Sequence, residues 1–166
     1  MNFYQRLGFL VLGSRLRRLS ESFLSGINRV YSAAGIEFDA SWFPVFYLLN
    51  KNGQLSIKEL SIQTEVSHPA ASQLIKNLKA KKLVISAPCE NDGRKQLIQL
   101  TRLGKQLLKE ILPIWDAILK AMDELVDENP KCKPLIEAIS LLENGFKDKS
   151  LSERISIQLL KTNLNA

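Results

Sequence analysis

Residues 55–101 read LSIKELSIQTEVSHPAASQLIKNLKAKKLVISAPCENDGRKQLIQLT, and the order of the signals in this stretch decides the fold. Two short helical patterns come first. Two apolar segments follow, separated by the turn Asn91-Asp92-Gly93-Arg94. Apolar residues that recur every three or four positions indicate amphipathic helices, whereas runs of Val, Ile and Leu bounded by Gly, Asn or Asp indicate strands. The stretch therefore predicts a helix-turn-helix followed by a β-hairpin, or wing.

The same part of the chain contains the surplus of positive charge. Residues 51–105 have ten basic and four acidic side chains, net +6, whereas residues 1–50 have net +2 and residues 106–166 net −2. A DNA duplex presents about one negative charge per ~1.7 Å of its axis, and releasing the counterions of those charges drives sequence-independent affinity. Double-stranded DNA is therefore the predicted partner.

Both helices of the predicted helix-turn-helix have a recognisable beginning. Ser56 and Glu59 have the spacing of a capping box, in which each side chain accepts a hydrogen bond from the other residue's backbone N–H. A short helix is therefore predicted over 57–64. Ser67 is a good N-cap for the second helix, predicted over 67–81.

This second helix has two chemically different faces. Ala71, Leu74, Ile75 and Leu78 form an apolar face at helical spacing, and the opposite face is small and polar. A helix of this size fits the ~12 Å width of the major groove. The residues of this helix and its cap that we predict to bind DNA are Ser67, His68, Pro69, Ala70, Ser72, Gln73, Lys76 and Asn77.

A long helix is predicted to follow the wing strands, which are expected over 83–89 and 95–100. Thr101 can cap this helix, predicted over 102–126. Pro113 should bend it, because proline removes one backbone hydrogen bond. Its apolar residues alternate at spacings of three and four, as is typical of a helix that packs along a partner. They are Leu108, Ile111, Trp115, Ile118, Met122 and Leu125.

Further amphipathic helices are predicted at both ends of the chain. Residues 5–32 have a helical apolar period and precede Gly35, a plausible stop. Residues 134–147 form another helix, and Ser150 with Glu153 can cap a last one. These helices are expected to bury their apolar faces against a second copy of the chain.

The expected fold is thus mainly α with a small β wing: a winged helix-turn-helix joined to long helices that form a dimerisation region. We divide the chain into an N-terminal dimerisation helix (1–35), a DNA-binding lobe (36–104) and C-terminal dimerisation helices (105–166).

The order of elements and the wing sequence resemble the MarR family of winged-helix transcription factors. The family pattern at the wing is an Asp-x-Arg turn, a strand ending in Leu-Thr and a long helix, and residues 92–101 match it with DGRKQLIQLT. The family's recognition helix contains a Ser and leads to Lys-Lys-Gly-Leu-Val, which residues 72–84 resemble. The resemblance covers roughly residues 10–147, although its specific motifs lie within 55–104.

Two residues depart from the family pattern. Lys82 replaces the glycine before Leu-Val, so a non-glycine residue has to adopt positive φ there at a cost of about 1 kcal/mol. Gln73 replaces an Arg that often follows the recognition-helix Ser. Because Arg suits guanine and Gln suits adenine, this departure shifts the expected operator preference without arguing against DNA binding.

The resemblance also implies how the wing and the single histidine act. Arg94 would enter a narrow A·T-rich minor groove, with Lys95 beside it and Asp92 fixing the guanidinium or a turn amide. The competing interpretation is an exposed turn with a chance charge pair. His68 would contact a phosphate or base edge, and the alternative is an exposed neighbour of the helix cap.

The resemblance further implies a homodimeric repressor on a pseudo-palindromic operator, released by a small-molecule or oxidant effector whose identity the sequence does not reveal. Trp42 and Trp115 suit either an aromatic-ligand pocket or apolar packing, and their helical apolar neighbours favour packing. Cys89 could sense oxidants, although a free cysteine is the simpler interpretation because no resolving cysteine lies near it in sequence.

The sequence offers little for catalysis or metal binding. It has no Gly-rich phosphate loop and no metal-ligand spacing of His, Cys and Asp. We therefore expect no enzyme, no cofactor and no metal, and a cytoplasmic protein without a membrane segment, because no apolar run approaches the ~20 residues that span a bilayer. Two other functions remain open: a winged-helix protein–protein adaptor, and a constitutive architectural DNA binder without an effector.

Overall fold

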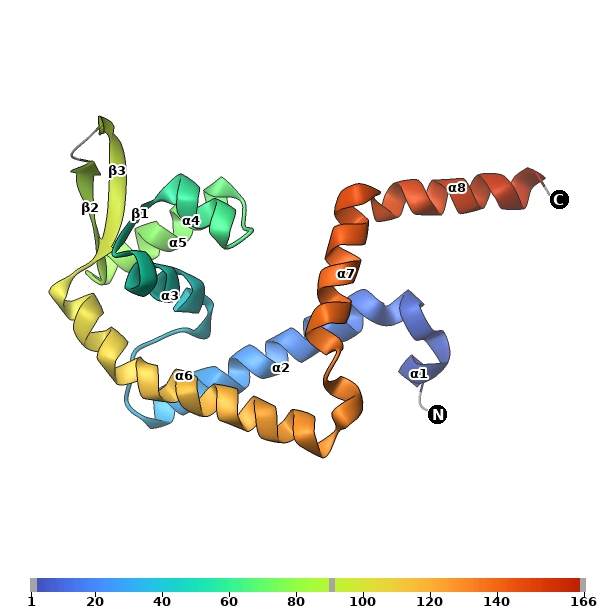
Figure 1. Ribbon diagram of the computed structural model, residues 1–166, viewed down its shortest axis with the longest axis horizontal. Coiled ribbons are helices and arrows are strands. Elements are labelled where there is room, and N and C mark those ends of the chain that lie inside the picture. Colours follow the sequence, from blue (N-terminus) through green and yellow to red (C-terminus); the bar gives the residue numbers. More distant parts are fainter. Residues whose placement is uncertain (1–2, 90–91, 165–166) are drawn as a thin grey trace. The chain divides into compact units, whose positions relative to one another are not determined.

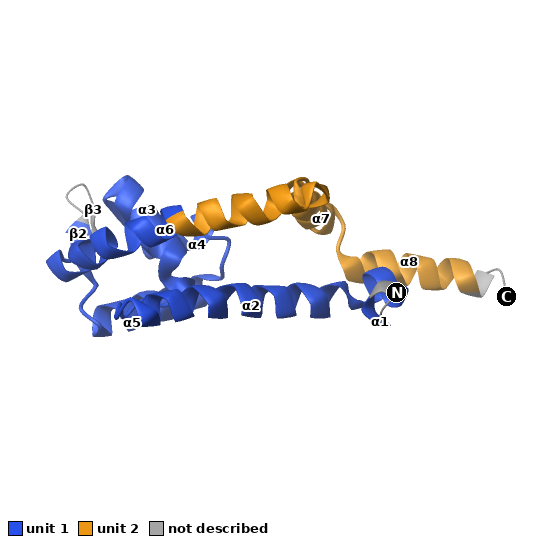
Figure 2. Cartoon of the chain, turned by 90° about the horizontal axis from the view of Figure 1, so that it is seen from below, with its two compact units in different colours: residues 1–116 blue, residues 117–166 orange. Residues whose placement is uncertain are grey.

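The computed structural model describes residues 3–89 and 92–164, which fall in two compact units, residues 1–116 and 117–166 (Figures 1 and 2). For Gln5, Cys89, residues 92–95 and residues 163–164 it describes the backbone alone. The chain is mainly helical with a small antiparallel sheet, which confirms the predicted fold class. None of the helices in the described ranges has the length and apolar character needed to cross a membrane.

The first unit contains the winged helix-turn-helix and the helices on either side of it. Its elements are α1 (Phe3–Leu7), the 3-10 turn η1 (Gly8–Val11), α2 (Leu12–Ala33), η2 (Ala40–Trp42), α3 (Phe43–Asn52), β1 (Gln54–Ser56), α4 (Ile57–Gln63), α5 (His68–Ala80), β2 (Val84–Cys89), β3 (Asp92–Leu100) and the first part of α6 (Arg102–Glu128). The second unit contains the end of α6, η3 (Pro130–Cys132), α7 (Leu135–Asp148) and α8 (Leu151–Leu164).

The three strands form one antiparallel sheet in the order β1-β3-β2. Ile98 of β3 lies between Leu55 of β1 and Ser86 of β2. Pro88 is tolerated because β2 is an edge strand, whose outer side needs no ladder hydrogen bond. The β2–β3 hairpin extends beyond α4 and α5 as a wing (Figure 1). Its strand β3 begins at Asp92, three residues earlier than the predicted 95.

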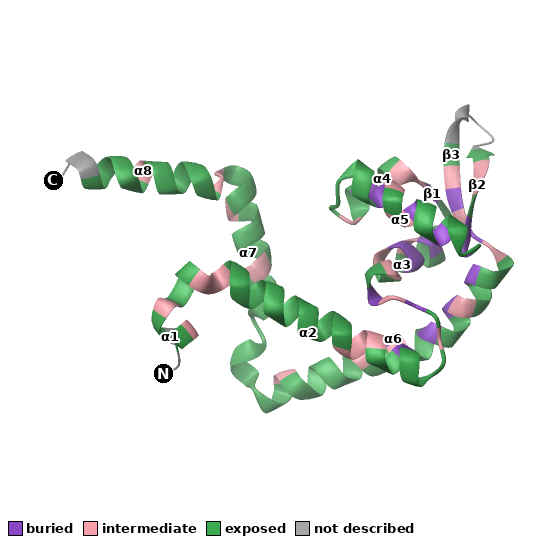
Figure 3. Cartoon of the chain, turned by 180° about the vertical axis from the view of Figure 1, so that it is seen from behind, coloured by how far each residue is buried: buried purple, intermediate pink, exposed green. Residues whose placement is uncertain are grey.

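The core of the first unit lies where α3, α4, α5, the sheet and α6 meet (Figure 3). Phe38 organises its aromatic part, with edge-to-face contacts to Tyr31 and Phe46 at 5.0 Å and to Trp42 at 5.5 Å. The largest fully buried side chains are Tyr31, Phe46, Leu49, Leu60, Ile75, Leu78, Ile98, Ile111 and Val84. Trp115 is also buried, and its ring lies 4.7 Å from that of Phe43, so the two tryptophans pack within apolar surroundings.

A buried hydrogen bond joins α2 to α6, because the Trp115 indole N–H donates to the Tyr31 hydroxyl at 3.0 Å. We predict that Tyr31→Phe lowers the free energy of unfolding by about 1–3 kcal/mol, since it leaves a buried donor without its partner. Burial raises the pKa of Tyr31, and the weaker effect of the Trp115 bond lowers it. The unfolded chain therefore loses the Tyr31 proton first as pH rises, and the stability contributed by the neutral phenol disappears at alkaline pH.

Urea unfolding at neutral pH and above pH ~10 measures both effects. The stability difference between wild type and Tyr31→Phe should shrink at the higher pH, because only the wild type has a phenol to ionise at this position. Equal stability of the two proteins at neutral pH would contradict the predicted role of the hydroxyl.

The described side chains of the second unit do not form a core of their own. None of residues 117–162 is buried, although α7 and α8 expose many large apolar side chains. The predicted cap of the last helix is confirmed: Glu153 accepts from the Ser150 backbone N–H at 2.9 Å, and the Glu153 N–H donates to the Ser150 hydroxyl at 3.3 Å. These bonds from Ser150 hold the pKa of the Glu153 carboxyl below its ordinary value.

The helix predicted over 5–32 is interrupted. Gly8 has φ +55°, a left-handed conformation that glycine adopts readily, and the short turn η1 separates α1 from α2. Gly35, with φ +69°, follows the end of α2 at Ala33 as predicted. The long helix α6 continues across Pro113 as one helical element to Glu128.

Candidate nucleic-acid interface

The helix-turn-helix is formed by α4, α5 and the turn between them. The predicted capping box of α4 is present: the Ser56 N–H donates to Glu59 at 2.7 Å, and the Glu59 N–H donates to the Ser56 hydroxyl at 3.2 Å. Ser67 caps α5 by accepting from the Ala70 N–H at 3.3 Å. Glu65, in the turn, has φ +53°. Local side-chain bonds therefore define where both helices begin.

The recognition helix α5 has one buried and one exposed face. Ala71, Ile75 and Leu78 are buried in the core of the first unit. On the exposed face, the Gln73 amide N–H donates to the Asn77 amide oxygen at 3.1 Å. The predicted DNA-binding residues that are exposed are Ser67, His68, Pro69, Ala70, Gln73, Lys76 and Asn77, whereas Ser72 is half-buried. Seven of these eight residues are thus accessible to a partner.

The three predicted site residues of the wing are Asp92, Arg94 and Lys95. Their backbone belongs to β3, and their side chains lie outside the described residues. Cys89, at the end of β2, likewise has no described side chain. The proposed minor-groove contact of Arg94 therefore stays a prediction.

A compact joint connects the end of α5 to the start of α6. We call Lys82, Leu83, Thr101 and Gly104 the α5–α6 joint. The Thr101 hydroxyl donates to the Lys82 carbonyl at 2.7 Å, and the Thr101 N–H donates to the Leu83 carbonyl at 3.0 Å. Thr101 also accepts from the Gly104 N–H at 3.0 Å, which makes it the cap of α6. Lys82 has φ +59°, as predicted for the residue that replaces the family's glycine.

Gly104 was missed by the reasoning from sequence. A Cβ atom at this position would lie 2.1 Å from the Leu83 carbonyl oxygen, far inside van der Waals contact. Glycine is therefore required for the backbone of the joint to pack against the first turn of α6. The available signal was an isolated glycine in an otherwise strong helix, which often marks a close approach of another backbone.

Two lysines at the end of α5 also make contacts that sequence reasoning did not assign. The Lys79 ammonium donates to the Ser86 hydroxyl of β2 at 2.5 Å, so the recognition helix is tied to the wing. The Lys81 ammonium lies 5.6 Å from the centre of the Trp42 ring and 3.9 Å from a Glu37 carboxylate oxygen. Lys81 therefore links the recognition helix to the segment between α2 and α3.

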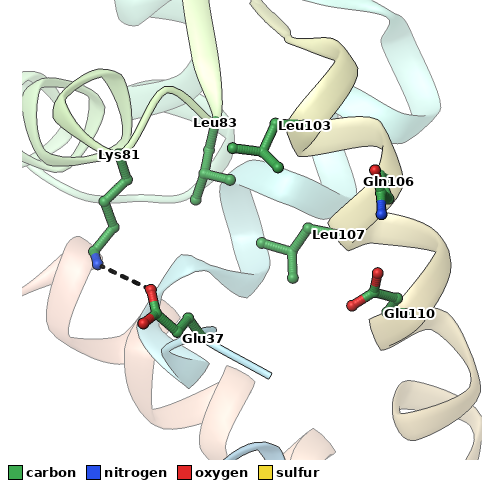
Figure 4. A pocket seen from close by; sticks show the side chains of 7 residues that line it. All are labelled: Glu37, Lys81, Leu83, Leu103, Gln106, Leu107 and Glu110. Atoms are coloured by element: carbon green, nitrogen blue, oxygen red, sulfur yellow. Dashed lines mark ion pairs between the residues drawn. The ribbon is translucent and has the colours of Figure 1, made fainter. Parts of the chain in front are cut away.

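A cavity of about 180 Å³ opens beside Lys81 (Figure 4). Its side chains come from the end of α5, the start of the wing, the α2–α3 segment and the first turns of α6. They are Glu37, Lys81, Leu83, Leu103, Gln106, Leu107 and Glu110. The cavity is thus lined by three leucines, two carboxylates, one lysine and one glutamine, and it borders the joint that supports the recognition helix.

Among the residues whose side chains are described, no three His, Cys, Asp or Glu residues gather closely enough to hold a metal ion. Cys132 is exposed and forms no disulfide. The first unit presents hydrogen-bonding groups and positive charge on the exposed helix α5 beside a β-hairpin.

A helix-turn-helix whose second helix is exposed and followed by a two-stranded wing defines the winged-helix class. Residues 36–95 match the family model described as MarR family, which confirms the resemblance found at the wing and recognition helix. This lobe of the chain is similar to the MarR family. The match covers α3 to the start of β3, and so contains the whole helix-turn-helix.

Known proteins with similar sequences or folds agree with this assignment. The chain is 29% identical over 76 residues to the HTH-type transcriptional repressor IacR of Pseudomonas putida, an alignment that spans 46% of each protein, or about half of the curated relative's length. The S. aureus MepR–DNA complex has a TM-score of 0.66 at 18% identity, covering 80% of this chain and 96% of that one. BpsR of Bordetella bronchiseptica has a TM-score of 0.53 at 22% identity, covering 93% and 98%. At these identities the solved structures establish the shared fold.

Proposed function

We propose that this chain is a sequence-specific, double-stranded-DNA-binding transcriptional regulator, and that it represses. One observation carries the proposal: α5 buries its apolar face and presents a continuous polar face, with Gln73, Lys76 and Asn77 exposed. Amide side chains in the major groove read base edges, and Asn or Gln pairs especially well with adenine. Lysine contacts phosphates and sets the position of the helix on the duplex.

The residues proposed to bind DNA are those predicted from the sequence. Ser67, His68, Pro69 and Ala70 begin the recognition helix, where the positive end of the helix dipole favours phosphate. Ser72 is half-buried, and we assign it to a position where the backbone of the recognition helix approaches DNA closely. Asp92, Arg94 and Lys95 provide the wing contact. The names of relatives support the assignment, since IacR is described as a repressor and MepR was solved with DNA.

We propose that the functional form is a homodimer. The absence of buried side chains among residues 117–162 supports this, because amphipathic helices with exposed apolar faces gain stability by covering them. A two-fold dimer presents two recognition helices to successive major grooves, about 34–36 Å apart, so the operator is expected to be pseudo-palindromic.

We propose that the cavity beside Lys81 receives a small-molecule effector. A ligand in this cavity that binds Glu37 would compete with Lys81 for that carboxylate, and Lys81 directly follows the recognition helix. BpsR provides a precedent, because its structure is described as showing regulation of DNA binding by 6-hydroxynicotinic acid. An oxidant acting at Cys89 is the second route proposed from the sequence.

Selection of bound fragments from a random duplex library tests the DNA-binding proposal. We expect two similar half-sites in inverted orientation, because the two recognition helices of the dimer are related by symmetry. Fluorescence anisotropy on the selected duplex should show at least a tenfold loss of affinity between ~50 and ~200 mM salt, since several phosphates are neutralised on binding. Recovery of no enriched sequence, with binding that is insensitive to salt, would contradict the proposal.

The same measurements separate the two other functions. A constitutive architectural binder should bind duplexes with the same loss of affinity at higher salt, but its binding should respond to no compound in a panel of metabolites and oxidants. A winged-helix adaptor should bind a protein partner without a steep salt dependence and should ignore duplexes. The proposed repressor is expected to bind the selected operator and to be released by at least one compound.

A further inference from the structure

The α2 helix has a basic edge beside an apolar stripe. At about 100° per residue, Arg15, Arg18 and Arg29 fall on the same side of this stripe, and all three are exposed. Glu21, the one acid of α2, lies on the opposite side, where it pairs with Arg17 at 2.8 Å. The stripe itself consists of Leu12, Leu16, Leu19, Phe23, Ile27 and Val30. Four of these are between 40% and 59% exposed, namely Leu16, Leu19, Phe23 and Val30.

The α6 helix has the complementary pattern. Its apolar stripe begins inside the core, where Leu108 and Trp115 are buried, and continues to Leu119, which is 64% exposed. By the same helical geometry, Asp116, Asp123 and Asp127 lie along one edge of that stripe, and all three are exposed. Lys120 lies at the outer margin of this acidic edge and leaves its net charge negative.

Four of these six charges are available for a partner, and the other two already have contacts within the chain. Among the described side chains, Arg15, Arg29, Asp116 and Asp123 have no ion pair, while Arg18 lies over the Tyr4 ring at 4.6 Å and Asp127 pairs with Lys133 at 3.1 Å. The basic edge extends over about 21 Å and the acidic edge over about 17 Å, at 1.5 Å per residue. Two edges of similar length and opposite charge, each beside an exposed apolar stripe, match one another.

We propose that the basic edge of α2 in one copy of the chain lies along the acidic edge of α6 in a second copy, with the apolar stripes packed between them. The inference rests on the proposed homodimer and specifies how its two copies recognise each other. Two-fold symmetry makes the pairing occur twice, so each charged residue contributes to the stability of the dimer at two places. Opposite charges beside an apolar seam fix the partner and the orientation, as in the flanking positions of coiled coils.

Charge exchange between two variants tests the pairing. The first variant is Arg15→Glu with Arg18→Glu, and the second is Asp116→Lys with Asp123→Lys. Each alone brings like charges together at both copies of the interface, and we expect its dimer dissociation constant to rise at least about tenfold at ~50 mM salt. Mixed in equal amounts, the two variants should form a heterodimer about as stable as the wild-type dimer, because both interfaces then join opposite charges.

Analytical ultracentrifugation measures the dissociation constants, and native mass spectrometry identifies the heterodimer by its mass. The matched control is Glu124→Lys with Glu128→Lys, which makes the same charge change on the opposite side of α6 and should leave the dimer intact. Circular dichroism confirms that each variant is folded. A wild-type chain that is monomeric would overturn the proposed homodimer itself. If the wild type is dimeric, two results would overturn the pairing alone. Either the charge-reversed variants remain dimeric on their own, or they become monomeric and form no heterodimer when mixed.

Discussion

Gly104→Ala should lower the free energy of unfolding by about 2–4 kcal/mol. The new Cβ would lie 2.1 Å from the Leu83 carbonyl oxygen and 3.2 Å from the Leu100 side chain. The oxygen cannot move freely, because it accepts the Thr101 N–H bond at 3.0 Å. Either α6 moves away from the joint or this hydrogen bond breaks, and both outcomes weaken the attachment of the wing to α6.

Gly13→Ala is the matched control for this substitution. Gly13 also lies within a helix, α2, but no heavy atom outside its local backbone is within 4 Å of the Cβ position. Alanine should therefore be neutral or stabilise the protein by up to about 1 kcal/mol, because it restricts the unfolded chain. Urea unfolding at one fixed protein concentration compares the two variants with the wild type. Equal effects of the two substitutions would show that the α5–α6 joint tolerates a side chain.

The recognition helix could be predicted from sequence because its determinants are local. Ser56 with Glu59, and Ser67, are capping signals whose partners lie within three residues, and the structure confirms each bond. The buried face of α5 follows from apolar spacing alone. Even the positive φ of Lys82 could be anticipated, since the residue occupies a helix end where the resembled family has glycine.

What sequence reasoning missed depends on contacts between residues far apart in the chain. One example is the close approach of Gly104 to Leu83, which depends on the packing of α6 against the lobe. Another is the position of Lys81 between Trp42 and Glu37, which depends on the packing of the α2–α3 segment. Apolar periodicity predicts that a face is buried without specifying what covers it. For this reason the cavity beside Lys81 appeared only in the structure, whereas the helices around it were predicted.

Lys76→Glu should lower the affinity for the selected operator by about 100-fold at ~100 mM salt. Lys76 is exposed on the polar face of α5, next to the Gln73–Asn77 pair, and has no ion pair among the described side chains. The substitution removes one cation and adds one anion at the proposed interface, and the dimer carries the change twice. Lys76→Ala should have a smaller effect, about tenfold, because it removes the attraction without adding repulsion.

The salt dependence distinguishes a phosphate contact from a general loss of binding. If each Lys76 neutralises one phosphate, the slope of log affinity against log salt should become less steep by about two for the alanine variant of the dimer. Lys131→Glu is the matched control, since it makes the same change of net charge at an exposed lysine of η3, outside the proposed interface. If Lys131→Glu weakened binding as much as Lys76→Glu, affinity would depend on the net charge of the chain. A specific effect of Lys76 would instead place the polar face of α5 against the duplex.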